Sequence, residues 1–184
     1  DNCISKYKMN IFVTDPDPNV SAQVLPDKHV VKMPVETCQI IALVYSDWYR
    51  NWGPIHRADG TAYNTIKGAF RNHPCTQWAV LKDSNLAWLI EHGIALCNEY
   101  SLRYSKLHGC FVALEQCKNI FCEITGKTPS EVKTKNNFVR AMPDEWKKDN
   151  TINTLTAYKR FIKSKYWPSS NYLKIPSRKP EWLL

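Results

Sequence analysis

Residues 27–36 of the chain bring together three side-chain types that could act on one substrate. If this stretch is helical, His29 and Glu36 lie within about 20° of each other around the helix and about 10 Å apart along it, with Lys32 between them. Imidazole, ammonium and carboxylate groups on one face could bind a substrate, transfer protons and form an imine. The alternative is a solvated polar stripe in which Lys32 and Glu36 form an ordinary i, i+4 pair.

Hydrophobic periodicity predicts the helices that would position these groups. We expect one helix to begin with Asp27 as its N-cap and to run to about Trp48. Pro34 lacks an amide hydrogen and crowds the preceding turn, so we expect a kink there or a break into two helices. Pro74 is well placed at the first position of the next helix. The same reasoning predicts further helices over residues 83–104, 111–124 and 151–166.

The fold class that these patterns indicate is all-α. No stretch alternates polar and apolar residues with period two, and no repeat or Gly/Ser linker marks a domain boundary. We therefore expect a single compact domain over residues 1–184, with several packed helices. Residues 1–18 would form an extended lead-in, residues 50–72 a turn-rich surface excursion, and residues 167–184 an irregular basic tail.

The positive charge of the chain is concentrated near its C-terminus. Residues 1–126 carry 12 Lys and Arg against 12 Asp and Glu, whereas residues 127–184 carry 13 against 5, which accounts for the whole net charge of +8. Lys159, Arg160 and Lys163 are followed by Trp167 and other aromatic residues. Cations interleaved with aromatic rings suit phosphate contacts and base stacking, so we expect a nucleic acid partner. The alternative is a solvated basic helix followed by a tail whose rings pack on the domain.

The cysteines indicate neither a metal site nor a disulfide framework. Seven cysteines stand at irregular spacing with no Cys-x-x-Cys pair, so we expect reduced, buried thiols. We expect no metal and no cofactor. No apolar stretch approaches the ~20 residues that a membrane span requires, and the first residues do not resemble a signal peptide.

Two further groups of polar residues could contact a substrate. His73, before Pro74, could make a substrate contact or cap the start of a helix. Arg103 and its neighbours form a polar end to a long apolar helix that could hold a phosphate, although cations near a helix C-terminus are also common without a ligand. This second group consists of Arg103, Tyr104, Lys106 and His108.

The segment from Leu25 to His29, followed seven residues later by Glu36, resembles the start of the pyrimidine-dimer DNA glycosylases of the phage endonuclease V type. Residues 85–99 are similar to the long second helix of those enzymes, and the aromatic, basic C-terminal segment is similar to their DNA-contacting end. The chain also resembles a group of phage proteins placed with these glycosylases. Their shared blocks correspond here to Asn10–Phe12, Lys28–Met33 and His73–Cys75.

The resemblance implies that Glu36 is the catalytic carboxylate and His29 a neighbour that contacts phosphate or base. Two family features differ. The arginines that flank the family's glutamate correspond to Val35 and Gln39, and the family's nucleophile is its N-terminal α-amine, whereas Asn10 is preceded here by nine residues. Asn10 would be terminal only if translation began at Met9 or if residues 1–9 were removed. If an imine forms, Lys32 is the substitute amine on the same helix face, and the alternative is simple hydrolysis by an activated water.

Together these observations predict a DNA glycosylase-like enzyme that cleaves the N-glycosidic bond of a damaged or modified pyrimidine, with AP-lyase activity left open. One alternative keeps the fold and acts on a free or modified nucleotide. Another is a non-catalytic nucleic-acid-binding or inhibitor protein. We expect a cytoplasmic protein, in the host cell if phage-encoded, with no membrane partner, and the sequence indicates neither a protein partner nor an oligomeric state. The expected catalytic residues are Glu36, His29 and Lys32. The expected substrate and DNA contacts are Asn10, Asp27, Lys28, Gln39, His73, Arg103, Tyr104, Lys106, His108, Lys159, Arg160, Lys163 and Trp167.

Overall fold

Helices joined by irregular segments make up the chain in a computed structural model, which describes residues 9–132 and 136–184. The helices in these residues are α2 (Pro18–Gln23), α3 (Asp27–Val44), α4 (Pro74–Leu81), α5 (Asp83–Tyr104), α6 (Phe111–Thr125), α7 (Asp144–Lys147) and α8 (Thr154–Ser164). Short 3-10 turns follow at η1 (Pro129–Glu131), η2 (Pro168–Ser170), η3 (Pro176–Arg178) and η4 (Glu181–Leu183).

The predicted all-α class is confirmed for the residues described. They contain no β-strand, only one isolated antiparallel bridge between His56 and Ala62 within the surface excursion. Apolar side chains from Met9 to Leu183 belong to one core, so the domain is compact. Of the predicted lead-in, residues 1–8 and with them Cys3 lie outside the described residues, and residues 9–17 are not helical. None of the described helices combines the length and the apolar character that crossing a membrane requires.

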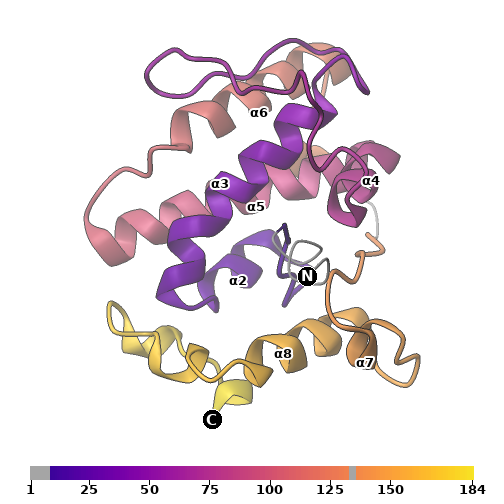
Figure 1. Cartoon of the computed structure of the whole chain (residues 1–184). Helices are drawn as coiled ribbons and strands as arrows, with labels where there is room; N and C mark the ends of the chain where they lie inside the picture. Colours follow the sequence, from indigo (N-terminus) through magenta and orange to yellow (C-terminus); the bar gives the residue numbers. More distant parts are fainter. Residues whose placement is uncertain (1–8, 133–135) are drawn as a thin grey trace.

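Helices α3 and α5 form the centre of the fold. They pack against each other, α6 and α4 pack against them, and α8 with the C-terminal segment lies beneath (Figure 1). The close packing depends on Gly93 of α5, where an added β-carbon would lie 2.7 Å from a methyl of Leu114 and 2.9 Å from the methyl of Thr37. Only glycine allows α5 to approach both neighbours at this point.

Helix α3 is continuous through Pro34, so of the two expected outcomes, a kink or a break, the break into two helices does not occur. Proline inside a helix costs about 3 kcal/mol because it removes one backbone hydrogen bond and crowds the preceding turn. Pro34 and eleven other residues of α3 are buried, and this burial offsets the local cost. The unbroken helix fixes the relative positions of His29, Lys32 and Glu36.

The other helices follow the sequence closely. α4 begins at Pro74, α5 covers 83–104 as expected, and α6 ends at Gly126, whose φ of +73° terminates the helix in the left-handed conformation. α8 is shorter than expected because the Asn153 side chain caps its start and the chain leaves the helix at Lys165. The short helix α7 was not predicted.

The C-terminal segment is fixed to the helices by a buried ionic cluster. Asp27 is the first residue of α3 and not its N-cap, because its carboxylate instead accepts hydrogen bonds from the backbone of Leu173 at 2.8 Å and Lys174 at 3.3 Å. Arg103 of α5 bridges Asp27 at 3.1 Å and Glu99 at 3.0 Å. Arg178 of η3 also binds Glu99, at 2.9 Å. We call these four side chains, Asp27, Glu99, Arg103 and Arg178, the tail anchor.

Candidate functional site

Glu36 lies on α3 as a partly buried carboxylate. Its Oε2 atom is inaccessible to solvent and has no hydrogen-bond partner among the described residues. Burial raises the pKa of Glu36 from 4.5 to about 7, and the charges of Lys32 and Lys165 and the backbone N–H of Asn10 oppose this rise. At neutral pH the carboxyl group is therefore divided between its two protonation states, which suits a group that exchanges a proton with a substrate or a water.

A tight turn holds the Asn10 backbone beside Glu36. The Asn10 side chain accepts the N–H groups of Ile11 at 2.7 Å and Phe12 at 2.9 Å, and donates to the carbonyl of Ala141 at 2.7 Å. Phe12 has a φ of +40°, which is unfavourable for a residue with a β-carbon. Strain of this kind persists where the surroundings impose it, and here the turn directs the Asn10 N–H at the Glu36 carboxylate.

His29 fills the space behind this turn. Its ring is fully buried, stacks on Phe12 with centroids 4.4 Å apart, and meets Trp167 edge-on at 5.1 Å. Neither ring nitrogen has a partner among the described residues. Burial, assisted by the charges of Lys32 and Lys165, lowers the pKa of His29 to about 3. The imidazole is therefore neutral at physiological pH and acts as a packing surface under the site.

Lys165, a member of the basic C-terminal segment that was not among the expected site residues, also belongs to this cluster. It follows α8, is partly buried, and places its ammonium 4.9 Å from the centre of the Phe161 ring and 5.8 Å from that of Phe12. Burial and the charge of Lys32 lower the pKa of Lys165, and Glu36 opposes this shift. The only available signal in the sequence was its position at the end of a basic helix, before two aromatic residues.

The start of α4 reaches the same place. The Cys75 thiol is buried, and its pKa is raised by burial and then by the negative charge of Glu36. His73 caps α4 by accepting the N–H of Cys75 at 3.1 Å, as one of the two interpretations of the sequence had it. The blocks Asn10–Phe12, Lys28–Met33 and His73–Cys75 thus meet around Glu36 although they are far apart in the sequence.

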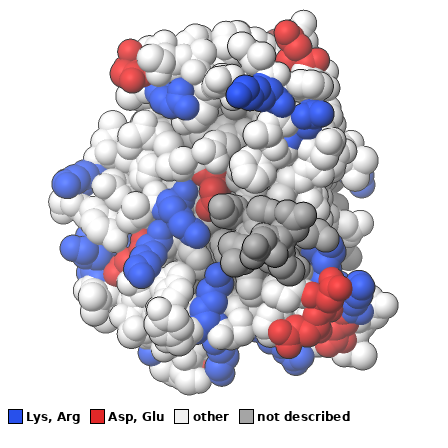
Figure 2. Space-filling model, viewed as in Figure 1, with Lys and Arg blue, Asp and Glu red and all other residues white. Residues whose placement is uncertain are grey.

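Cations and exposed rings surround this cluster. Lys28 lies with its ammonium 5.0 Å from the centre of the Trp167 ring, and Lys32 is exposed one helical turn further along α3. Tyr166, between Lys165 and Trp167, is 95% exposed. Figure 2 shows Lys and Arg side chains gathered around a small acidic patch near the middle of one face. We call Lys28, Lys32, Lys165, Tyr166 and Trp167 the basic rim.

Other residues singled out in the sequence lie elsewhere. Asp27 and Arg103 belong to the tail anchor. His108 is buried, accepts the N–H of Cys110 at 3.0 Å and contacts the carbonyl of Val31 at 2.8 Å. These groups hold the fold together and face no open surface, so they do not enter our proposals as DNA contacts. Two of the remaining candidates are exposed, Gln39 on α3 and Lys106 just after α5. Tyr104 lies under the ammonium of Lys174. The face of α8 opposite its buried side carries Lys159, Arg160 and Lys163.

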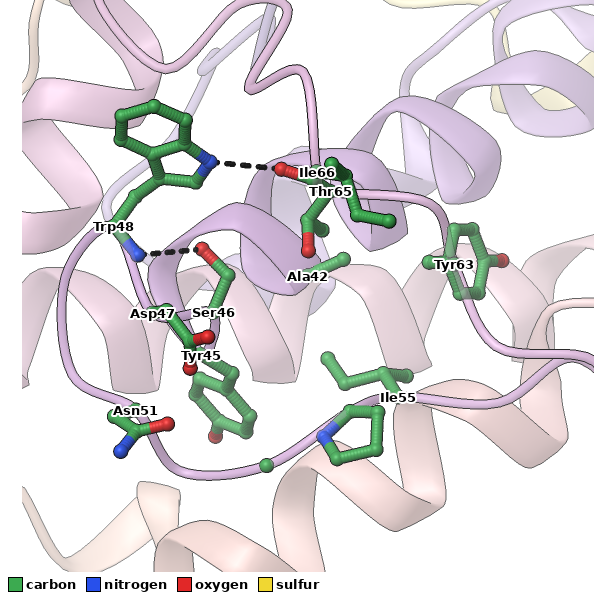
Figure 3. A pocket seen from close by; sticks show the side chains of 12 residues that line it. Ala42, Tyr45, Ser46, Asp47, Trp48, Asn51, Ile55, Tyr63, Thr65 and Ile66 are labelled. Carbon is green, nitrogen blue, oxygen red and sulfur yellow. Dashed lines mark hydrogen bonds between the residues drawn. The ribbon is translucent and has the colours of Figure 1, made fainter.

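A cavity of about 560 Å³ lies at the other end of α3. Figure 3 shows Tyr45, Trp48 and Tyr63 around it, with the Trp48 indole N–H donating to the carbonyl of Thr65 at 2.7 Å. Glu36 is not among the residues that line it. We therefore place the candidate site at the Glu36 cluster, where the titratable groups converge, and not in this cavity. Within residues 9–132 and 136–184, no three His, Cys, Asp or Glu side chains are arranged to hold a metal ion.

Comparison with known protein families matches residues 9–111, more than half of the chain, to the family described as pyrimidine dimer DNA glycosylase. The matched region contains Asn10, Glu36 and Cys75, and it ends before α8 and Lys165. Comparisons with curated proteins and with solved structures gave no significant match.

Proposed function

Because the chain belongs to the pyrimidine dimer DNA glycosylase family, we propose that it cleaves the N-glycosidic bond of a damaged pyrimidine in DNA. The observation that carries this proposal is the partly buried Glu36 carboxyl, with a pKa of about 7, at the meeting point of three separate sequence blocks. A carboxyl group whose pKa is close to the working pH is suited to general acid–base catalysis.

In the proposed reaction, ionised Glu36 acts where positive charge develops. The bond between C1′ and the base breaks with its electron pair leaving on the base, which gives the sugar oxocarbenium character. The Glu36 carboxylate stabilises that charge and accepts the proton of the water that attacks C1′.

The basic rim would hold the DNA. Lys28, Lys32 and Lys165 are suited to phosphate contacts, and the exposed ring of Tyr166 to stacking on a base. Val35 and Gln39, where the family has arginines, supply no charge. We therefore propose that the lysines of the basic rim contact the phosphates of the DNA backbone.

Cleavage of the glycosidic bond in three kinds of substrate tests this proposal, measured as abasic sugars in the duplexes, because a dimerised base stays joined to its neighbour, and as free base from the nucleosides. The protein would be given duplex DNA carrying one cyclobutane pyrimidine dimer, the same duplex without the dimer, and free pyrimidine nucleosides. We expect cleavage of the glycosidic bond in the dimer duplex alone. Cleavage of free nucleosides alone would favour the nucleotide alternative, and binding without cleavage of any substrate would favour a non-catalytic protein.

A further inference from the structure

Two cysteines from distant parts of the chain are in contact where α3 meets the start of α6. The cysteines among the described residues are free thiols, and all of them except Cys122 are buried. Cys38 of α3 and Cys110, the residue just before α6, are 72 positions apart, yet the Cys38 thiol donates to the carbonyl of Cys110 at 4.0 Å. A disulfide forms only between cysteines that the fold already holds close together, and this pair meets that condition.

The surroundings of Cys110 favour its thiolate. Its sulfur lies 3.9 Å from the hydroxyl of Tyr63, and its backbone N–H donates to His108 at 3.0 Å. Hydrogen bonding from the Cys38 thiol lowers the pKa of the Cys110 thiol; burial opposes this shift, and His108 and Tyr63 add to it. The start of a helix such as α6 also stabilises negative charge. Because the thiolate is the reactive form of cysteine, Cys110 is the one of the pair that attacks.

Cys110 is also the member of the pair that a small molecule can approach. It retains 8% exposure, whereas Cys38 has none. The Tyr63 side chain, whose hydroxyl contacts the Cys110 sulfur, lines the cavity of about 560 Å³ at the end of α3 (Figure 3). Hydrogen bonding with Cys110 and burial both raise the pKa of Cys38, so Cys38 remains a protonated thiol. The two cysteines are therefore suited to different roles.

We propose that Cys38 and Cys110 form a redox site that hydrogen peroxide converts reversibly into a disulfide. The Cys110 thiolate attacks one oxygen of the peroxide, the O–O bond breaks, and hydroxide leaves, which gives a sulfenic acid on Cys110. The Cys38 sulfur then attacks the sulfenic sulfur and the S–O bond breaks. The departing hydroxide takes the Cys38 proton and becomes water. The two cysteines lose two electrons and the peroxide gains them.

The neighbouring cysteines are less suited to this chemistry. Burial raises the pKa of Cys97 and of Cys117, so both remain protonated thiols. Cys122 is the most exposed of the described cysteines and therefore serves as the control for oxidation by exposure alone. Cys38 stands two positions after Glu36, so the disulfide would join the helix of the candidate site to the start of α6. The redox site requires only the two thiols and does not depend on the proposed cleavage of DNA.

Peptide mapping of the oxidised wild-type chain tests this proposal without any variant. The reduced full chain is treated with hydrogen peroxide, its remaining thiols are alkylated, and the digest is analysed by mass spectrometry before and after reduction. We expect a pair of peptides joined through Cys38 and Cys110, lighter by two hydrogens than the two thiol peptides, that separates in dithiothreitol. A disulfide between other cysteines in its place, oxidation of Cys122 without this link, or no disulfide would overturn the proposal.

Variants separate the attacking thiol from the thiol that closes the bond. Cys38→Ser should leave a sulfenic acid on Cys110 that dimedone captures, whereas Cys110→Ser should leave Cys38 unmodified. Cys122→Ser is the matched control and should form the disulfide as the wild type does. Capture of dimedone by Cys38 in the Cys110→Ser chain, or no capture by Cys110 in the Cys38→Ser chain, would contradict the two roles.

Urea denaturation of the oxidised and the reduced wild-type chain gives an independent readout. A disulfide between residues 72 positions apart restricts the unfolded chain, so the oxidised chain should unfold at a higher urea concentration than the reduced chain. Dithiothreitol should restore the lower midpoint. An oxidised chain that unfolds at a lower urea concentration would show that the bond distorts the packing of α3 and α6, and would overturn the inference that the fold holds the two thiols ready to join.

Discussion

Replacing Glu36 with glutamine should stabilise the protein at neutral and alkaline pH. The folded chain holds Glu36 in surroundings that disfavour its charge, so its pKa is raised from 4.5 to about 7. Glutamine has nearly the same shape and no proton to lose. The substitution therefore removes a loss of folding stability that occurs in the wild type only when Glu36 ionises.

The sign and size follow from linkage between proton binding and folding. Below pH 4.5 the carboxyl is protonated in both folded and unfolded chains, so it adds no pH dependence. Between pH 4.5 and 7 the folded chain retains a proton that the unfolded chain has lost, and wild-type stability falls as pH rises. One pKa unit corresponds to about 1.4 kcal/mol, so the whole cost is about 3 kcal/mol.

Urea denaturation from pH 4 to 8.5 measures this effect. The free energy of unfolding of Glu36→Gln relative to wild type should rise by about 3 kcal/mol across this range, in favour of the variant. Glu123→Gln, at an exposed position of α6, is the control and should show no such trend. A difference that stays constant with pH, or that favours the wild type at pH 8, would refute the burial argument for Glu36.

Four further results are expected. Tyr166→Ala should weaken DNA binding by about 1–3 kcal/mol in a titration and leave the melting temperature unchanged, since the ring is exposed and, as proposed, stacks on a base. Lys28→Gln should reduce the slope of log affinity against log salt by about one, whereas Lys67→Gln, on the surface excursion, should leave the slope as it is. Arg103→Met should cost about 3–5 kcal/mol of stability in urea, because it removes the cation that lies between the buried carboxylates of Asp27 and Glu99, while folded molecules bind DNA normally; weakened binding would return Arg103 to the interface. His92→Phe should make the folded protein less sensitive to acid. Burial lowers the pKa of His92 from 6.5 to about 3, so keeping this imidazole unprotonated lowers the wild-type free energy of unfolding by about 2 kcal/mol at pH 5. An equal loss of stability in acid by the variant would contradict this.

The parts of the fold that depend on local pattern could be predicted from the sequence. The bounds of α5 and α6 follow from apolar periodicity and from Gly126, and the relative positions of His29 and Glu36 follow from helical geometry alone. Pro34 shows the limit of such reasoning. Its local penalty is evident in the sequence, whereas the burial that offsets it depends on helices far away in the chain.

Spacing alone could predict the candidate site only where its residues share one helix, whereas Asn10 and the His73–Cys75 block followed from the family resemblance and Trp167 from the basic, aromatic pattern of the C-terminal segment. Lys165 stands 129 positions after Glu36, and no spacing rule connects them. Arg103 looked like a phosphate ligand because its partners Asp27 and Glu99 cannot be identified from pattern. The positive φ of Phe12, which positions the Asn10 backbone, arises from side-chain hydrogen bonds and tertiary packing and has no signature of its own.

Single-turnover cleavage of the glycosidic bond of a dimerised pyrimidine by wild type and Glu36→Gln tests the central claim most directly. Both proteins would be mixed in excess with a duplex that carries one cyclobutane pyrimidine dimer, with binding measured in parallel. The cleaved base stays joined to its neighbour through the cyclobutane ring, so the product is measured as an abasic sugar, by strand scission in hot alkali. We expect cleavage by the wild type, none by Glu36→Gln, and similar affinity of the two proteins for the duplex. Cleavage at the wild-type rate by Glu36→Gln would contradict the assignment of Glu36 as the catalytic carboxylate.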